Sequence, residues 1–213
     1  MFALLVLAIA LGANAEDDPA ADAAARTQQL FDAVAAITGD SDIPADAKRA
    51  RVVSLITPFL DYASLTRAAL GPDAKRFSHE EYSEFSHEYS RFVTASLVRR
   101  FAVFPGQSNP VEGARFDEKR KIAIVISHSV EAKPGYPGIR RLAKLEPLKI
   151  ELALRQRHGE WRLAGLRRGG VDVGRTFREQ FASVLEREEP AALIAQLRER
   201  NRQTDAENPF AAE

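Results

Sequence analysis

The stretch "KIAIVISHSVEA", residues 121–132, decides the fold class, because apolar side chains recur in it at every second position. A period of two is the repeat of a β-strand, whose successive side chains point to opposite faces of a sheet. We expect the face formed by the even positions to be the buried one. It carries the larger apolar residues, namely Ile122, Ile124, Ile126 and Val130, together with His128. The odd positions, such as Ala123 and Ser127, then share the opposite face.

Two further strands are predicted after this one. The stretch "LKIELALRQR", residues 148–157, alternates in the same way, and "HGE" then turns the chain into a strand at "WRLAGL", residues 161–166. Tightly joined alternating stretches are typical of an antiparallel sheet with one apolar face. The segment "EAKPGYPGIRRLAKLEP", residues 131–147, is predicted to be a long loop, because it contains two Pro-Gly pairs.

Outside these stretches, apolar residues recur near every 3.6 positions, which predicts amphipathic helices. The expected helices cover residues 21–37, the segment between Pro44 and Pro58, a short segment capped by Asp61 that stops at Gly71, a long one after Ser78, and two more after Gly174 and Pro190. Ser78 followed by Glu81 forms a capping box at the start of the long helix. The sequence therefore predicts an α+β fold, in which a twisted antiparallel sheet packs against a cluster of helices with an apolar pocket between them.

The composition is that of an ordinary globular protein. The 213 residues are 45% hydrophobic, and thirty Lys and Arg balance thirty Asp and Glu. We expect a monomer with a single domain over residues 21–204 and a flexible tail over residues 205–213. A balanced charge gives no field that would concentrate nucleic acid, so no nucleic-acid partner is expected. The chain has no cysteine, which excludes disulfides, thiolate metal sites and cysteine nucleophiles.

The first fifteen residues, "MFALLVLAIALGANA", carry no charge and end in small residues at the spacing that a signal peptidase accepts. An acidic, alanine-rich segment follows at once. The apolar run is too short for a bilayer, which needs about 20 helical residues. We therefore expect residues 1–15 to be a signal peptide and the protein to be exported.

The stretch "GGVDVGRT", residues 169–176, has the glycine spacing of a phosphate-binding P-loop, but Arg175 stands where that loop needs lysine. A P-loop also requires a parallel sheet with further strands, and no further strand is predicted after Thr176. The alternative is a sharp connection from strand to helix, with Asp172 or Thr176 as the N-cap. We favour this alternative, so no nucleotide cofactor is expected.

The four histidines do not form a recognisable catalytic or metal site. His79 and His87 are eight residues apart, whereas a metalloprotease helix needs histidines four apart. His158 falls in a predicted turn, and His128 on a predicted apolar face is more often a core residue than a base. No Gly-x-Ser-x-Gly motif occurs. With no catalytic set and much apolar surface, the chain is predicted to be a container rather than an enzyme, with no metal and no cofactor.

Three segments resemble the MlaC family, the toluene-tolerance auxiliary components of ABC-type lipid transport. They are "ITPFLDYASLTRAALG" at 56–71, "FSHEYSRFVTASLVRRF" at 85–101 and "WRLAGLRRGGVDVGRTFREQF" at 161–181. In the first, Pro58, Phe59 and Asp61 precede Leu70-Gly71, as in the family's Pro-aromatic-x-Asp element. In the third, a Trp-bearing strand leads into a glycine and a later aromatic-Arg-x-x-Phe motif, which is carried by Trp161, Gly170, Phe177, Arg178 and Phe181.

The resemblance implies a periplasmic phospholipid shuttle that maintains outer-membrane lipid asymmetry. Its implied partners are a phospholipid, an inner-membrane MCE-type ABC transporter complex and an outer-membrane lipoprotein complex. The acyl chains are expected between sheet and helices. The candidate wall residues are Phe92, Val93, Leu97, Phe101, Ile122, Ile124, Ile126, Leu152, Leu154, Trp161, Phe177 and Phe181.

Each of these side chains could equally be plain core, and sequence alone does not separate the two. Basic residues that could meet head groups or an acidic partner surface are Arg99, Arg100, Arg140 and Arg141. Two alternatives remain open at this point. One is a carrier of another apolar lipid such as a hopanoid, and the other is a small-molecule isomerase or hydrolase of cone-shaped α+β fold with His128 inside.

Overall fold

The computed structural model describes residues 18–107, 109–128 and 148–211. The signal peptide predicted at residues 1–15 and the loop predicted at 131–147, with Val130, Arg140 and Arg141, lie outside the described residues. The described chain contains α1 (Pro19–Gly39), α2 (Ala45–Ile56), the 3₁₀ turn η1 (Thr57–Phe59), α3 (Tyr62–Leu70), η2 (Gly71–Arg76), α4 (His79–Val103), β1 (Val111–Asp117), β2 (Ile122–His128), β3 (Lys149–Arg157), β4 (Glu160–Arg168), β5 (Val171–Asp172), α5 (Val173–Leu185) and α6 (Pro190–Asp205). This confirms the α+β prediction.

Three of the described helices begin at side-chain caps that the sequence predicted. Ser78 accepts from the backbone N–H of Glu81 at 3.2 Å, while the Glu81 carboxylate accepts from the Ser78 N–H, so the capping box at the start of α4 is confirmed. Asp61 caps α3 through the N–H of Ser64. Asp172 caps α5 through the N–H of Arg175. Each carboxylate satisfies an N–H that has no partner within its helix.

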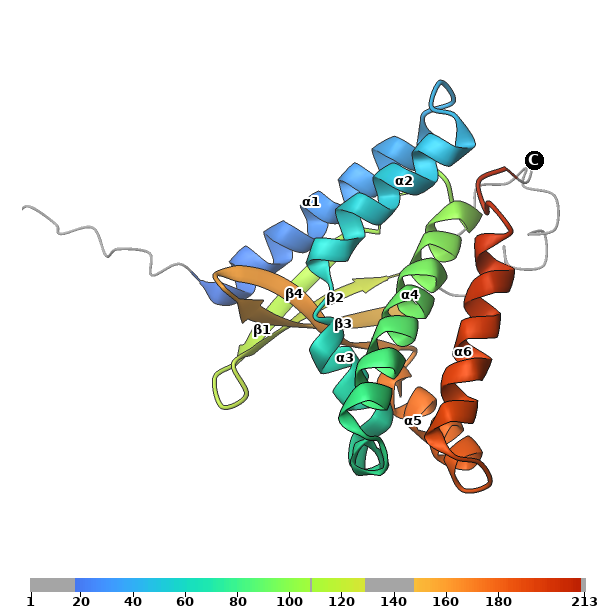
Figure 1. The fold of residues 1–213 in the computed structure, drawn as a ribbon. Helices are drawn as coiled ribbons and strands as arrows, with labels where there is room; N and C mark the ends of the chain where they lie inside the picture. Colours follow the sequence, from blue (N-terminus) through green and yellow to red (C-terminus); the bar gives the residue numbers. More distant parts are fainter. Residues whose placement is uncertain (1–17, 108, 129–147, 212–213) are drawn as a thin grey trace, which may run out of the picture.

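The five described strands form an antiparallel sheet in the order β1-β2-β3-β4-β5. His158 and Gly159, both with positive φ, join β3 to β4 in a tight hairpin, at the turn expected from the sequence. Strand β1 was not predicted, because Glu112, Gly113 and Arg115 interrupt any apolar alternation at this sheet edge. The helices lie against one face of the sheet, and α4 and α6 run side by side (Figure 1).

The prediction of which face of β2 is buried is wrong. Ala123, Val125 and Ser127 are fully buried, whereas the even positions 122, 124, 126 and 128 are only half-buried. Directly opposite residues of antiparallel strands share a face, and Val125 lies opposite Leu152 while Ala123 lies opposite Leu154. The buried leucines of β3 therefore fix the odd positions of β2 toward the helices. Because β2 is apolar on both faces, its alternation alone could not make this choice.

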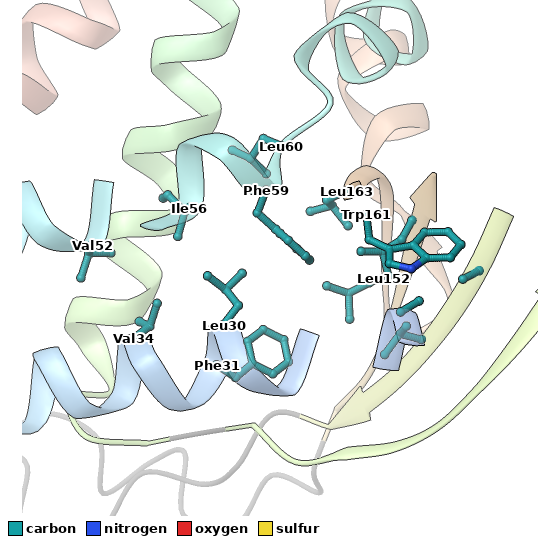
Figure 2. Packing of buried hydrophobic residues seen from close by; sticks show 14 of the residues in the cluster. Leu30, Phe31, Val34, Val52, Ile56, Phe59, Leu60, Leu152, Trp161 and Leu163 are labelled. Atoms are coloured by element: carbon teal, nitrogen blue, oxygen red, sulfur yellow. The ribbon is translucent and has the colours of Figure 1, made fainter. Parts of the chain in front are cut away.

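Two hydrophobic clusters result. The sheet–helix core joins α1, α2, η1 and α4 to the inner face of the sheet, and Figure 2 shows Leu30, Phe59 and Leu152 pointing into the space between these layers. The aromatic cluster joins α3, α4, α5 and α6. Its buried members are Ala69, Leu70, Phe77, Phe85, Tyr89, Phe181, Leu185, Leu193, Ile194 and Leu197. Both clusters involve α4, which is therefore the central helix of the fold.

Candidate lipid site

Five of the twelve predicted pocket residues lie at the sheet–helix core alone. Leu152, Leu154 and Trp161 are at most 5% exposed and face the helices from β3 and β4, while Leu97 and Phe101 of α4 pack against the same cluster. The Trp161 indole Nε1–H donates to Asp22 Oδ2 of α1 at 2.8 Å, which fixes the ring between the layers. These side chains belong to one packed cluster, so lipid tails could lie within it only if the layers move apart.

Four more predicted residues belong to the region of the aromatic cluster. Phe92 of α4 meets Phe177 of α5 edge-on with ring centroids 5.5 Å apart, and Phe177 stacks on Phe181 at 5.8 Å. Val93 contacts this cluster and the sheet–helix core alike. The remaining three, Ile122, Ile124 and Ile126, lie on the outer face of the sheet, away from both clusters. The prediction that they lie between sheet and helices is therefore wrong, because it assigned the wrong face of β2 as buried.

A groove of about 430 Å³ opens between α2 and α4, beside the end of α6. Its volume falls within the range of about 300–1,000 Å³ that is common for small-molecule sites. The groove is lined by side chains of α2, η1, α3, α4, α6 and the segment after α6, which are Arg49, Val53, Thr57, Tyr62, His87, Ser90, Arg91, Thr94, Ala95, Val98, Thr204, Asp205 and Pro209. None of them was among the predicted pocket residues.

The groove is apolar at its floor and polar toward its sides. Val98 at the floor is 3% exposed and is a member of the sheet–helix core, against which Val53 also packs. Above them the Tyr62 hydroxyl and Thr94 Oγ1 share a hydrogen bond of 2.6 Å, which joins α3 to α4. The floor of the groove is therefore continuous with the protein's main hydrophobic core.

Charged side chains close one side of the groove. Asp205, at the end of α6, pairs with Arg49 of α2 at 3.1 Å and also with Arg91 of α4. Arg91 reaches Glu88 Oε2 at 3.1 Å as well. Asp205 and Arg91 are well exposed to solvent, so these pairs contribute little stability. They form a bridge of ion pairs at the groove, and breaking these pairs costs little free energy.

Glu88 anchors α4 to α6 beneath this bridge. It is buried, and its Oε2 accepts from Asn201 Nδ2 at 2.7 Å. Burial opposes ionisation of Glu88, but the hydrogen bonds from Asn201 and Arg198 and the charge of Arg91 outweigh it, so its pKa is lowered. A charged Glu88 therefore holds the two helices together at neutral pH.

Asp61, singled out by its sequence motif, has a structural role in the described chain. Its carboxylate accepts from the Ser64 hydroxyl at 2.7 Å and from Arg157 Nε of β3 at 2.9 Å. Burial opposes its ionisation, yet these hydrogen bonds outweigh burial and lower its pKa. The backbone N–H of Asp61 also donates to the carbonyl of Leu163 at 2.9 Å. The motif therefore ties the start of α3 to the sheet.

The glycine of the same segment meets the arginine of the later motif. Gly71 has a φ of +54°, and a Cβ there would lie 2.8 Å from the Arg178 side chain. Arg178 Nε in turn donates to the carbonyl of Ala68 at 2.9 Å, near the end of α3. Two motifs far apart in sequence thus form one junction between α3 and α5.

Comparisons with known proteins agree with this architecture. The sequence matches the model of the family described as MlaC protein over residues 25–199, which is more than half of the chain. The chain belongs to the MlaC family. The structure is similar to that of a phospholipid-binding protein from Ralstonia solanacearum, solved in complex with a phospholipid, with a TM-score of 0.66 and 21% identity over 86% of this chain and 98% of the other. No curated protein matches the sequence.

The structure describes all four histidines of the sequence. His128 pairs with Glu112 through Nδ1 at 2.6 Å on the outer face of the sheet, so the alternative that placed it inside a cone is wrong. His79, His87 and His158 are exposed. Over residues 18–107, 109–128 and 148–211, no group of three His, Asp or Glu side chains is arranged to hold a metal. In the same described ranges, no helix combines the length and apolar character of a membrane span.

The stretch "GGVDVGRT" is a connection, as the sequence analysis favoured. Gly169 and Gly170 have φ values of +56° and +80° and turn the chain from β4 into the short β5. Asp172 Oδ1 then accepts from the Arg175 N–H at 2.9 Å and starts α5. Arg175 itself pairs with Glu179 at 2.8 Å one turn along. Arg175, which stands where a P-loop has lysine, is therefore paired within its own helix.

Of the four arginines suggested for head groups, the two that the structure describes, Arg99 and Arg100, have partners. Arg99 pairs with Glu207 at 3.1 Å, and the Arg100 guanidinium lies 4.1 Å from the centre of the Phe104 ring.

The groove was not predicted from the sequence, although one signal of it was present there. Ser86, Ser90 and Thr94 recur at every fourth position of α4, and each hydroxyl donates to the carbonyl one turn before it. Such a hydroxyl stripe, four residues apart, indicates a helix face outside the hydrophobic core.

Proposed function

We propose that this protein binds a phospholipid and carries it through the periplasm as a monomer. The observation that carries the proposal is the groove between α2 and α4, with its charged rim and its floor in the sheet–helix core. A lipid needs an apolar space for its tails and a polar opening for its head group, and the groove offers both. Membership of the MlaC family and the phospholipid bound to a protein of similar fold support it.

The physical chemistry of lipids explains why such a carrier is needed. Transfer of apolar surface into water costs about 0.8 kcal/mol per methylene group, so about thirty methylenes of two acyl chains would cost roughly 24 kcal/mol to expose. A free lipid therefore does not cross an aqueous compartment at a useful rate. A protein that covers the tails removes most of this barrier.

The groove of the structure is smaller than a complete lipid. A methylene occupies about as much space as a water molecule, about 30 Å³, so 430 Å³ holds roughly one acyl chain. A second chain requires opening of the sheet–helix core, in which Leu152 is buried and against which Leu97 and Phe101 of α4 pack. We propose that the lipid-free protein is closed and that binding opens this core.

The transport route is part of the proposal. An inner-membrane MCE-type ABC transporter complex and an outer-membrane lipoprotein complex would be the two partners between which the lipid moves. Export to the periplasm would depend on the signal peptide predicted at residues 1–15. Cell fractionation tests the location, and recovery of the protein in the cytoplasm alone would contradict it.

The binding proposal is tested by extracting protein purified from its native cells and analysing the extract by mass spectrometry. We expect a phospholipid at about one molecule per chain. A hopanoid or another polycyclic lipid in its place would redirect the proposal to that ligand. Protein that carries no lipid, and that takes up none after incubation with phospholipid vesicles, would refute it.

A further inference from the structure

The bridge at Asp205 has the chemistry of a phosphate site. Its two carboxylate oxygens meet two guanidinium groups, with Oδ1 facing Arg49 and Oδ2 facing Arg91. A phosphodiester likewise presents two charged oxygens, and arginine is the side chain best suited to bind such a pair. The carboxylate of Asp205 therefore occupies a position that a phosphate could fill.

The position of the two arginines fits a head group rather than a free ion. They line the groove from α2 and α4, and each helix also contributes a valine to the lining, Val53 on α2 and Val98 on α4. A phosphate held by both arginines would leave an acyl chain free to follow the floor toward the sheet–helix core. Charge and apolar surface are thus arranged in the order in which a phospholipid presents them.

The chain after α6 lies over the same two helices. Asn208 Nδ2 donates to Asp46 Oδ1 of α2 at 2.7 Å, and Glu207 pairs with Arg99 of α4 at 3.1 Å. All four side chains are exposed or half-exposed, so water competes with each contact. The segment therefore holds Asp205 in place through contacts that are individually weak.

We propose that Arg49 and Arg91 bind the phosphate of the lipid head group at the mouth of the groove, and that Asp205 is an internal competitor displaced when the lipid enters. This inference rests on the proposed function, since it names the part of the lipid that the groove recognises. It also assigns a role to the end of α6: the carboxylate keeps the arginines paired while the groove is empty.

The inference is tested by titrating delipidated protein with three soluble probes in a calorimeter. The probes are dihexanoylphosphatidylcholine below its micelle concentration, dihexanoylglycerol, which lacks the phosphate, and inorganic phosphate. We expect the wild type to bind the phospholipid more tightly than the diacylglycerol. Arg49→Gln and Arg91→Gln should each weaken phospholipid binding by about tenfold and leave diacylglycerol binding unchanged.

Asp205→Asn should act in the opposite direction, because it removes the competitor. We expect it to tighten phospholipid binding by about two- to fivefold, the range of an exposed ion pair, with no change for the diacylglycerol. The matched control is Arg202→Gln on the same helix, whose partner is Glu199 and which does not line the groove. The control should bind both lipids as the wild type does.

The outcomes separate this inference from the proposed function. If the wild type binds neither dihexanoyl lipid, both fail. If it binds both lipids equally, or if the arginine variants weaken both to the same extent, only the phosphate assignment fails. If inorganic phosphate alone binds as tightly as the phospholipid, the site belongs to the free ion and the head-group assignment is overturned. Arg91→Gln also loses the ion pair with Glu88. If that variant does not fold, Arg49→Gln alone still tests the assignment.

Discussion

The sheet–helix core and the groove share Val98 of α4, yet they are built differently. The core is closed by fully buried side chains from distant elements, such as Val34 and Leu154. The groove is bordered by hydroxyls and by exposed ion pairs such as Arg49 with Asp205. Burial of apolar surface stabilises far more than exposed ion pairs do. The comparison indicates that stability resides in the two buried clusters, whereas the ligand recognition that we propose would reside at the groove.

The largest expected effect comes from the aromatic cluster. Phe85 is fully buried and lies 5.5 to 5.6 Å from the rings of Phe77, Tyr89 and Phe181. Phe85→Ala should lower the free energy of unfolding by about 3–5 kcal/mol, because it leaves a cavity. Urea denaturation measures this. Val103→Ala, at an exposed position of the same helix, should change it by less than about 0.5 kcal/mol, and equal losses in the two variants would contradict the account.

The junction between α3 and α5 should give the next largest effect. Gly71→Ala places a side chain at a φ of +54° and against Arg178, so we expect a loss of about 1–3 kcal/mol in the free energy of unfolding. Gly113→Ala is the matched control, since a Cβ there meets nothing within 4 Å. A Gly71→Ala protein as stable as this control would show that the junction is not tightly packed.

The third prediction concerns pH. The lowered pKa of Asp61 means that its charged form is favoured by folding, so its stabilisation is present above the ordinary value of 3.8 and is lost as the pH falls through its lower folded value. Asp61→Asn keeps an N-cap but loses the charge, and it should cost about 1.5 kcal/mol at pH 7. The difference from the wild type should shrink below pH 3.8, as measured by urea denaturation at both pH values. A constant difference would contradict the assignment.

The smallest effect on stability is expected at the groove itself. Asp205→Asn should lower the free energy of unfolding by less than about 1 kcal/mol, because its ion pairs are exposed to solvent. Thermal unfolding measures this change. A loss as large as that of Phe85→Ala would mean that the bridge is part of the stable core, and the contrast between the two regions would then be wrong.

The sequence predicted what local patterns determine. The Ser78 capping box, the Asp61 cap and the His158–Gly159 hairpin are each set by residues a few positions apart, and each is present. The wrong face of β2 shows the limit. Pairing with β3 decides which face of β2 is buried, and its own alternation does not. Residues 129–147 separate the two strands in the sequence, so no local pattern contains this pairing.

The groove could not be predicted from sequence patterns. Arg49 and Asp205 are 156 residues apart, and only the packing of α2, α4 and α6 brings them together. Leu152 and Trp161 could be predicted to be buried from their period, but a pocket wall and a core residue have the same period. The charged residues that border the groove, such as Arg49, Arg91 and Asp205, form no local sequence motif, so nothing in the sequence brought them together.

The most direct test of the central claim uses the absence of native cysteine. Ala95→Cys places a single thiol in the groove, and Ser96→Cys places one at the next position of α4, on its exposed side. The rate of thiol alkylation is measured for each variant before and after loading with phospholipid. The account predicts that lipid slows alkylation at position 95 and leaves position 96 unchanged. Equal rates at position 95 with and without bound lipid would contradict it.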